Sequence, residues 1–114
     1  MVIQRGDIWW SSLPEPVGSS PGYPRPVLVV QSDRFNRSEI NTVVIAIISK
    51  NTRLANSEGN VLITMQQSKL PNDCVVNVSQ LFSIDEVVLR DYVSSLSEKK
   101  MLQIDVGLRK VLAL

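Results

Sequence analysis

Three polar residues are predicted to lie at the ends of buried β-strands, where their side chains could act together on a phosphate group. Arg25 stands at the start of one apolar run, Ser49 directly after a second, and Asp73 just before a third. An arginine can give two parallel hydrogen bonds to a phosphate, and a serine hydroxyl can give another. If the first two strands are antiparallel neighbours, the start of one lies beside the end of the other, and Arg25 meets Ser49.

Each of these residues also has a structural interpretation. Arg25 could pair with a surface carboxylate, and Asp73 could cap the turn formed by residues 68–73. Ser49 could satisfy a backbone group where its strand ends. Pro26 makes Arg25 the strongest of the three, because a residue before proline is held extended, here between a buried strand and a turn-rich loop at residues 14–24.

The composition of the chain excludes several other kinds of site. The 114 residues, 44% apolar and 20% charged, are expected to form one globular domain over residues 1–114. The chain has no histidine, which is the commonest general base and metal ligand, and its single cysteine, Cys74, excludes an intrachain disulfide. We therefore expect neither a metal ion nor another cofactor.

The charge balance limits how a polyanion could bind. The formal net charge is +1, from 12 basic and 11 acidic residues, so such a partner needs a local strip or a groove shared between subunits. No apolar run approaches the ~18 residues that span a membrane, and no secretory signal pattern is present. A cytoplasmic protein without membrane contact is the expectation.

Short apolar runs rich in β-branched residues predict a mainly β protein. Strands are expected over residues 8–10, 25–31, 42–48, 60–64 and 75–80. The second and third of these runs are apolar without alternation, which indicates strands buried on both faces. The last run alternates, so Val76 and Val78 are expected on one face and Asn77 on the other.

Two capping boxes predict helices towards the C-terminal end. The box that begins at Ser83 predicts a short helix, and the box that begins at Ser95 opens a final helix that reaches about Leu112. Gly107 inside that helix could permit a close packing contact. Four or five antiparallel strands, tight turns and a C-terminal helix predict a mainly β (α+β) fold, in which a small, strongly bent antiparallel sheet closes towards a barrel.

Three motifs, in matching order and spacing, resemble the MazF/PemK/Kid family of toxins. They are Arg5-Gly6-Asp7-Ile8-Trp9, the run Arg-Pro-Val-Leu-Val-Val-Gln-Ser-Asp from Arg25, and residues 76–85 with Gln80 and Ile84-Asp85. The resemblance implies an SH3-like barrel with a C-terminal helix. It also implies a homodimeric, metal-independent endoribonuclease that cuts single-stranded RNA, often mRNA, at short sequences and is held inactive by an antitoxin.

The resemblance also implies site roles. The family's catalytic arginine falls on Arg25, and its strand-end hydroxyl, commonly a threonine, falls on Ser49. The RNA would supply its own nucleophile, the 2′-hydroxyl, and the product would be a 2′,3′-cyclic phosphate. Since an arginine side chain stays protonated in proteins, we expect Arg25 to stabilise the charged phosphorane rather than to remove a proton.

Four aromatic residues are candidates for stacking on unpaired bases: Trp9, Trp10, Tyr23 and Phe35. At least two of the four are expected to lie in the core, with Phe35 and one tryptophan as the first candidates. The predicted RNA-binding set is Tyr23, Trp10, Gln80 and Asp73. The predicted homodimer would use apolar residues such as Ile84 and Leu108.

Two other functions fit a fold of this kind. One is a non-enzymatic toxin that poisons DNA gyrase, and the other is an SH3-like module that binds peptides. The pairing of Arg25 with Ser49 argues against the gyrase poison, as does an aliphatic C-terminal end that lacks a tryptophan anchor.

Overall fold

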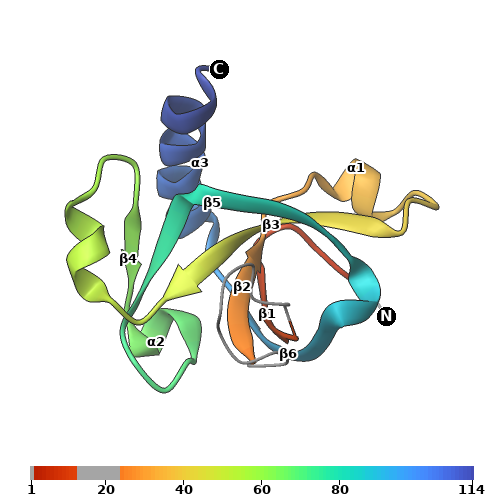
Figure 1. Ribbon diagram of the computed structural model, residues 1–114, viewed down its shortest axis with the longest axis horizontal. Coiled ribbons are helices and arrows are strands. Elements are labelled where there is room, and N and C mark those ends of the chain that lie inside the picture. The colour runs from red at the N-terminus through yellow and green to blue at the C-terminus, as the bar shows by residue number, and fades with distance from the viewer. Residues whose placement is uncertain (1, 13–23) are drawn as a thin grey trace, which may run out of the picture.

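The computed structural model describes residues 2–12 and 24–114. Its strands are β1 (Asp7–Ser11), β2 (Arg25–Val29), β3 (Thr42–Ser49), β4 (Val61–Ile63), β5 (Cys74–Asp85) and β6 (Leu89–Ser95). These six strands of the described part form one antiparallel sheet in the order β4-β5-β3-β2-β1-β6, and the sheet curls strongly (Figure 1). The predicted mainly β fold with a bent antiparallel sheet and a C-terminal helix is confirmed, with one strand more than expected.

Apolar residues cover both faces of the central strands. Leu28 and Ala46 belong to one buried cluster, whereas Val29 and Ile45, next to them along the chain, belong to a second cluster. All four side chains are fully buried. This arrangement explains the unbroken apolar runs of β2 and β3, because successive strand residues point to opposite faces and both faces are covered.

The C-terminal helix α3 (Glu98–Leu112) covers the first cluster. Its buried residues Met101, Ile104 and Leu108 join the same cluster as Val76 and Val78 of β5. The predicted alternation in β5 is therefore confirmed. Leu108 is only 9% exposed, so it serves the core and not the outer surface of the helix that a second subunit could reach.

Gly107 brings α3 into backbone contact with the loop before β4. A Cβ atom at position 107 would lie 2.1 Å from the carbonyl oxygen of Gly59. Gly59 itself has a φ of +88°, a conformation that glycine adopts readily. The close contact expected at Gly107 is confirmed, and it fixes how near α3 lies to the sheet.

The helix predicted to begin at Ser83 is wrong. Ser83 lies within β5 and pairs with Val44 of β3. The chain turns helical only in the short 3-10 helix η2 (Glu86–Val88), where the Asp85 side chain accepts a hydrogen bond from the N–H of Val87. Pairing with β3 satisfies the backbone hydrogen-bonding groups of this segment. The segment is therefore a strand, although its sequence carries a helix-capping pattern.

The final helix begins two residues later than predicted. Ser97 is its N-cap, and the Ser97 hydroxyl accepts from the N–H of Lys100. Ser95 belongs instead to β6, a strand that the sequence did not predict, and its hydroxyl donates to the Asp7 carboxylate at 2.7 Å.

Three short helices complete the described chain: α1 (Asp33–Asn36), the 3-10 helix η1 (Thr52–Asn56) and α2 (Met65–Ser68). The helical turn predicted for residues 32–36 is confirmed as α1, with the Ser32 side chain as its cap. None of the helices in the described ranges is both long and apolar enough to cross a membrane.

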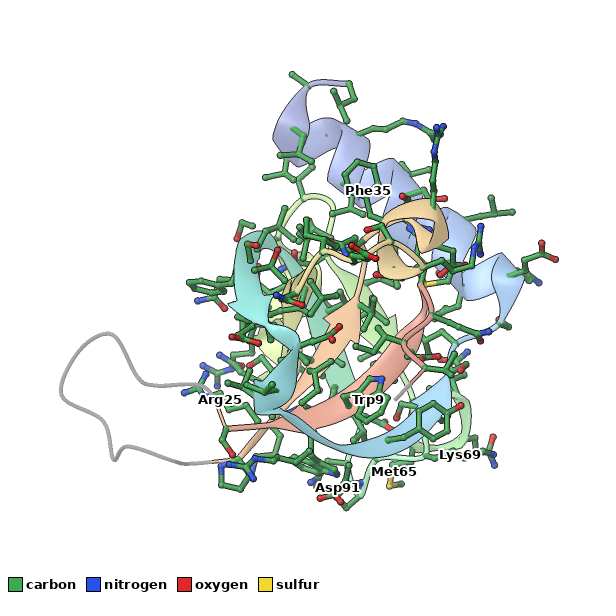
Figure 2. The ribbon with its side chains drawn as sticks, turned by 90° about the vertical axis from the view of Figure 1, so that its right-hand side faces the viewer. Trp9, Arg25, Phe35, Met65, Lys69 and Asp91 are labelled. Atoms are coloured by element: carbon green, nitrogen blue, oxygen red, sulfur yellow. The ribbon has the colours of Figure 1, made fainter. Side chains whose placement is uncertain are left out.

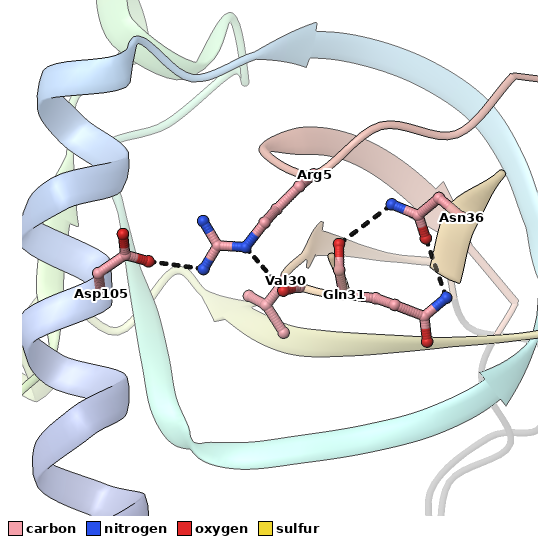
Figure 3. A network of polar contacts seen from close by, with 5 residues as sticks. All are labelled: Arg5, Val30, Gln31, Asn36 and Asp105. Atoms are coloured by element: carbon pink, nitrogen blue, oxygen red, sulfur yellow. Dashed lines mark hydrogen bonds and ion pairs between the residues drawn. The ribbon is translucent and has the colours of Figure 1, made fainter. Parts of the chain in front are cut away.

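Arg5 ties α3 to the sheet (Figure 3). Its Nε donates to the carbonyl oxygen of Val30 at 2.9 Å, and a terminal guanidinium nitrogen binds the Asp105 carboxylate of α3 at 2.6 Å. The backbone N–H of Arg5 donates to Asp33 at 2.7 Å, and this bond is the main reason why the pKa of Asp33 lies below its usual value. Arg5, the first residue of the Arg-Gly-Asp motif, therefore has a structural role: it connects α3 and α1 to the sheet.

Candidate active site

A pocket of about 480 Å³ opens where β2 begins and β3 ends. Residues from β1, β2, β3 and the segment before β5 line it: Trp10, Pro24, Arg25, Pro26, Ile48, Ser49, Lys50, Asn51, Leu70, Pro71, Asn72 and Cys74. Both predicted catalytic residues are in this set. The pocket combines cationic, hydroxyl and amide groups with the aromatic ring of Trp10. Such a lining suits a phosphate group and a neighbouring base.

The sheet register brings Arg25 and Ser49 together. Val27 pairs with Ile47 and Leu28 with Ala46, so the same antiparallel register, continued two residues towards the pocket, sets Arg25 opposite Ser49. Residues opposite each other on neighbouring strands point to the same face of the sheet. The geometric expectation drawn from the strand ends is thus met by the register and by the shared pocket.

The Ser49 hydroxyl is held by the turn that follows β3. Its Oγ accepts a hydrogen bond from the backbone N–H of Asn51 at 3.1 Å, and the Asn51 side chain in turn accepts from the N–H of Arg53 as the cap of η1. A hydroxyl oxygen can accept this bond and still donate its own proton. Ser49 therefore has a structural contact and keeps the chemistry required of a phosphate donor.

Two cationic residues line the pocket. Arg25 and the exposed Lys50 both line it, and Lys50 follows Ser49 directly in the chain. Cys74 lies deeper and is 2% exposed. Burial raises the pKa of its thiol above the usual value, although nearby Lys50 acts in the opposite direction. The thiol is therefore neutral, and the charge of this pocket comes from its cations.

The aromatic candidates differ in burial and in position relative to the pocket. Trp10 is partly exposed and lines the pocket, whereas Trp9 is buried and meets Tyr92 edge to face, with ring centroids 5.7 Å apart. Phe35 is 55% exposed on α1, so the expectation that it lies in the core is wrong, and Figure 2 shows it well away from Arg25. Tyr23 lies outside the described residues.

The remaining two predicted residues do not line the pocket, as the structure describes it. The Asp73 carboxylate accepts a hydrogen bond from the N–H of Met65 at 2.8 Å, at the first residue of α2. The contact gives Asp73 a structural role, although at the first turn of α2 and not in the turn of residues 68–73 that was the alternative. Gln80 is exposed on β5, and its side chain accepts a hydrogen bond from Asn77 at 3.0 Å.

Several lining residues were missed at the sequence level, namely Lys50, Asn51, Leu70, Asn72 and Cys74. Lys50 and Asn51 carried a usable signal, because they continue directly from Ser49 at a strand end. Leu70, Asn72 and Cys74 arrive through the turn before β5, and their position depends on the pairing of β5 with β3. Within the described ranges no group of three or more His, Cys, Asp or Glu residues could hold a metal ion.

Comparison with known proteins defines the class. A family model described as "PemK-like, MazF-like toxin of type II toxin-antitoxin system" matches residues 4–112, and the chain belongs to this family. The endoribonuclease MazF6 of Mycobacterium tuberculosis is 44% identical over 114 residues, which cover 100% of this chain and 100% of that protein. The predicted identity, a toxin endoribonuclease of a toxin-antitoxin pair, is confirmed, and the alternative of a peptide-binding module is not supported.

Solved structures agree on the fold. An endoribonuclease from a mycobacterial species superposes with a TM-score of 0.80 over 100% of this chain and 94% of that chain, at 20% identity. A second endoribonuclease, solved in complex with its cognate antitoxin and also from a mycobacterial species, has a TM-score of 0.75 at 20% identity, over 99% of this chain and 95% of that one.

Proposed function

We propose that this toxin cuts single-stranded RNA, mRNA in particular, at short sequences and without a metal ion, with Arg25 and Ser49 as its catalytic residues. The observation that carries the proposal is that Arg25 of β2 and Ser49 of β3 line one pocket, which Lys50 also lines. Two cations in a pocket would repel a metal ion but attract a phosphate. The absence of histidine throughout the chain fits the same mechanism.

In this mechanism the substrate provides the nucleophile. The 2′-hydroxyl attacks the adjacent phosphorus, the 5′-oxygen leaves, and a 2′,3′-cyclic phosphate results. Arg25 gives two parallel hydrogen bonds to the phosphate oxygens, and Ser49 gives a third as negative charge grows. Arg25 is assigned electrostatic stabilisation, since a guanidinium stays protonated in proteins and is a poor proton acceptor.

RNA binding is proposed to use the aromatic ring of Trp10 in the pocket. Trp10 is partly exposed there, so its ring can stack on an unpaired base next to the cut. Tyr23 is kept as a second stacking residue on the strength of the sequence. Asp73 is left out of the proposed set, because its carboxylate serves the first turn of α2.

The partners proposed are a second copy of the chain and an antitoxin. Apolar side chains on the outer face of α3 support the homodimer, since Leu102 is 64% and Val106 51% exposed. Light scattering should give a dimer mass, and a fully active monomer would contradict it. A structural relative is complexed with its cognate antitoxin, and we propose that an acidic segment of an antitoxin covers the Arg25 pocket in the cytoplasm.

Cleavage of a long RNA in EDTA tests the proposed function. The wild-type protein should cut at defined sites and leave cyclic phosphate ends. Arg25→Lys should lose about 10²–10³ in rate while it stays folded, because lysine cannot reproduce two parallel contacts to a phosphate. Activity that requires an added metal ion, or near-normal cleavage by Arg25→Lys, would overturn the mechanism.

A further inference from the structure

A buried amide fixes the orientation of the Gln80 side chain. Asn77 is only 8% exposed, and its Oδ1 accepts from the backbone N–H of Ser79 at 3.3 Å and from the Ser79 hydroxyl at 2.8 Å. Because a backbone N–H can only donate, this Asn77 atom must be the oxygen. The amide nitrogen of Asn77 therefore faces Gln80, and it donates to Gln80 Oε1 at 3.0 Å.

The same logic applies to Gln80. An amide nitrogen cannot accept a hydrogen bond, so the Gln80 atom that faces Asn77 must be the carbonyl oxygen. The amino group of Gln80 consequently lies on the side of the amide that is turned away from Asn77. Gln80 is exposed, so its amino group is available to donate a hydrogen bond to a ligand.

This pair lies on the same face of the sheet as the proposed catalytic residues. Ser49 pairs with Val75 and Ile47 with Asn77, so Ser49 and Asn77 are diagonal neighbours on one face. Such neighbours are about 7–8 Å apart. Arg25 continues this face on β2, through the register that sets it opposite Ser49.

An irregularity in β5 turns Gln80 outwards. Ala46 of β3 pairs with Leu81, whereas the next residue, Ile47, pairs with Asn77. Residues 78–80 therefore stand out of the regular pairing as a bulge. A bulge beside a site can redirect one side chain, and here Asn77 holds the bulge through its bonds to Ser79 and Gln80.

We propose that Gln80 is a specificity-determining residue, which selects a base with a keto oxygen, uracil or guanine, beside the scissile phosphate. Asn77 is its positioning residue. An N–H donor from Gln80 pairs with a keto oxygen, whereas the exocyclic amino group of adenine or cytosine in that place would meet it donor to donor. This inference rests on the proposed RNA cleavage at Arg25 and Ser49.

The test uses the full chain and an RNA with a randomised central segment, cut in EDTA and sequenced at the new ends. Wild-type protein should show a preference for uracil or guanine at one position beside the cut. Gln80→Glu presents only acceptors, so the preference there should move towards cytosine or adenine by about tenfold. Gln80→Ala should flatten the preference, and Gln66→Glu at an exposed position of α2 is the matched control that should keep it.

Asn77 has a separate readout. In Asn77→Asp the carboxylate still accepts from Ser79, but it also requires a donor from Gln80, which must turn its amino group inwards. The base preference should then shift in the same direction as in Gln80→Glu, in protein whose melting temperature shows it to be folded. Asn77→Ala should broaden the preference.

The outcomes separate the two proposals. Wild-type protein that cuts no RNA in EDTA refutes the proposed function, and this inference with it. Cleavage that continues with an unaltered base preference in both Gln80 variants refutes the inference alone. A preference that moves in the Gln80 variants but not in folded Asn77→Asp removes Asn77 from its positioning role and overturns that half of the proposal.

Discussion

At the scale of single residues, the Ser49 hydroxyl must satisfy two demands. The backbone N–H of Asn51 holds its oxygen at 3.1 Å, which restricts where the hydroxyl proton can point. In a threonine, a branched Cβ would restrict χ1 instead. The contact with Asn51 thus supplies part of the order that serine lacks, and it makes Ser49 a good test of whether the hydroxyl acts on the phosphate or only on the turn.

Ser49→Ala should lower kcat by about 10²–10³, with a much smaller change in KM, because the proposed hydrogen bond strengthens as charge develops in the transition state. Ser49→Thr should keep most activity, since the hydroxyl is retained. Ser49→Cys should be poor, because a thiol is a weak donor. Single-turnover cleavage together with thermal melts of the three variants measures this.

If Ser49 had only a structural role, the melting temperature and the cleavage rate of Ser49→Ala would change differently. Ser49→Ala would then melt at a lower temperature, since the N–H of Asn51 loses its acceptor, while single-turnover cleavage of the folded fraction would stay at the wild-type rate. That result would remove Ser49 from the catalytic pair and leave Arg25 alone.

At the scale of the elements, the position of α3 depends on the contact between Gly107 and Gly59. A Cβ at position 107 would meet the carbonyl oxygen of Gly59 at 2.1 Å and Cγ1 of Val78 at 3.2 Å. Gly107→Ala should therefore destabilise the protein by about 1–3 kcal/mol through overpacking. This holds even though alanine favours a helix by about 1 kcal/mol over glycine.

Urea unfolding of Gly107→Ala measures this effect, and Gln66→Ala at an exposed position of α2 is its control. The control should lie within about 0.5 kcal/mol of the wild type, as surface substitutions usually do. A Gly107→Ala protein as stable as the wild type would show that the loop at Gly59 can move away from α3 at little cost.

The element scale also shows what the sequence could predict. Unbroken apolar runs identified β2 and β3 and so placed Arg25 near Ser49, because burial on both faces leaves a strong signal. In β6 only Leu89 is buried, and the strand therefore carried no clear apolar pattern. The orientation of Gln80 was also out of reach, since it depends on a bulge whose register is set by β3 and not by residues close in the chain.

At the scale of the whole molecule, the chain is almost neutral, with a net charge of +1, and yet it must hold a polyanion. The cations at its pocket therefore attract a polyanion only at short range. Salt screens their attraction beyond a Debye length of about 8–10 Å. The most direct way for an antitoxin to inhibit the toxin is to place carboxylates against the same cations. RNA and antitoxin are then expected to exclude each other.

Binding of a fluorescent RNA with a 2′-deoxy sugar at the cut site, which cannot be cleaved, tests this competition. Increasing amounts of the purified cognate antitoxin should raise the apparent Kd of the RNA without limit, as direct competition requires. Arg25→Ala should weaken the binding of both ligands, because each is proposed to place negative charge on that guanidinium. Gln66→Ala, at an exposed residue of α2 that does not line the pocket, should weaken neither. If the apparent Kd instead reaches a plateau and a ternary complex forms, the antitoxin acts from another surface, and the Arg25 pocket is not its binding site.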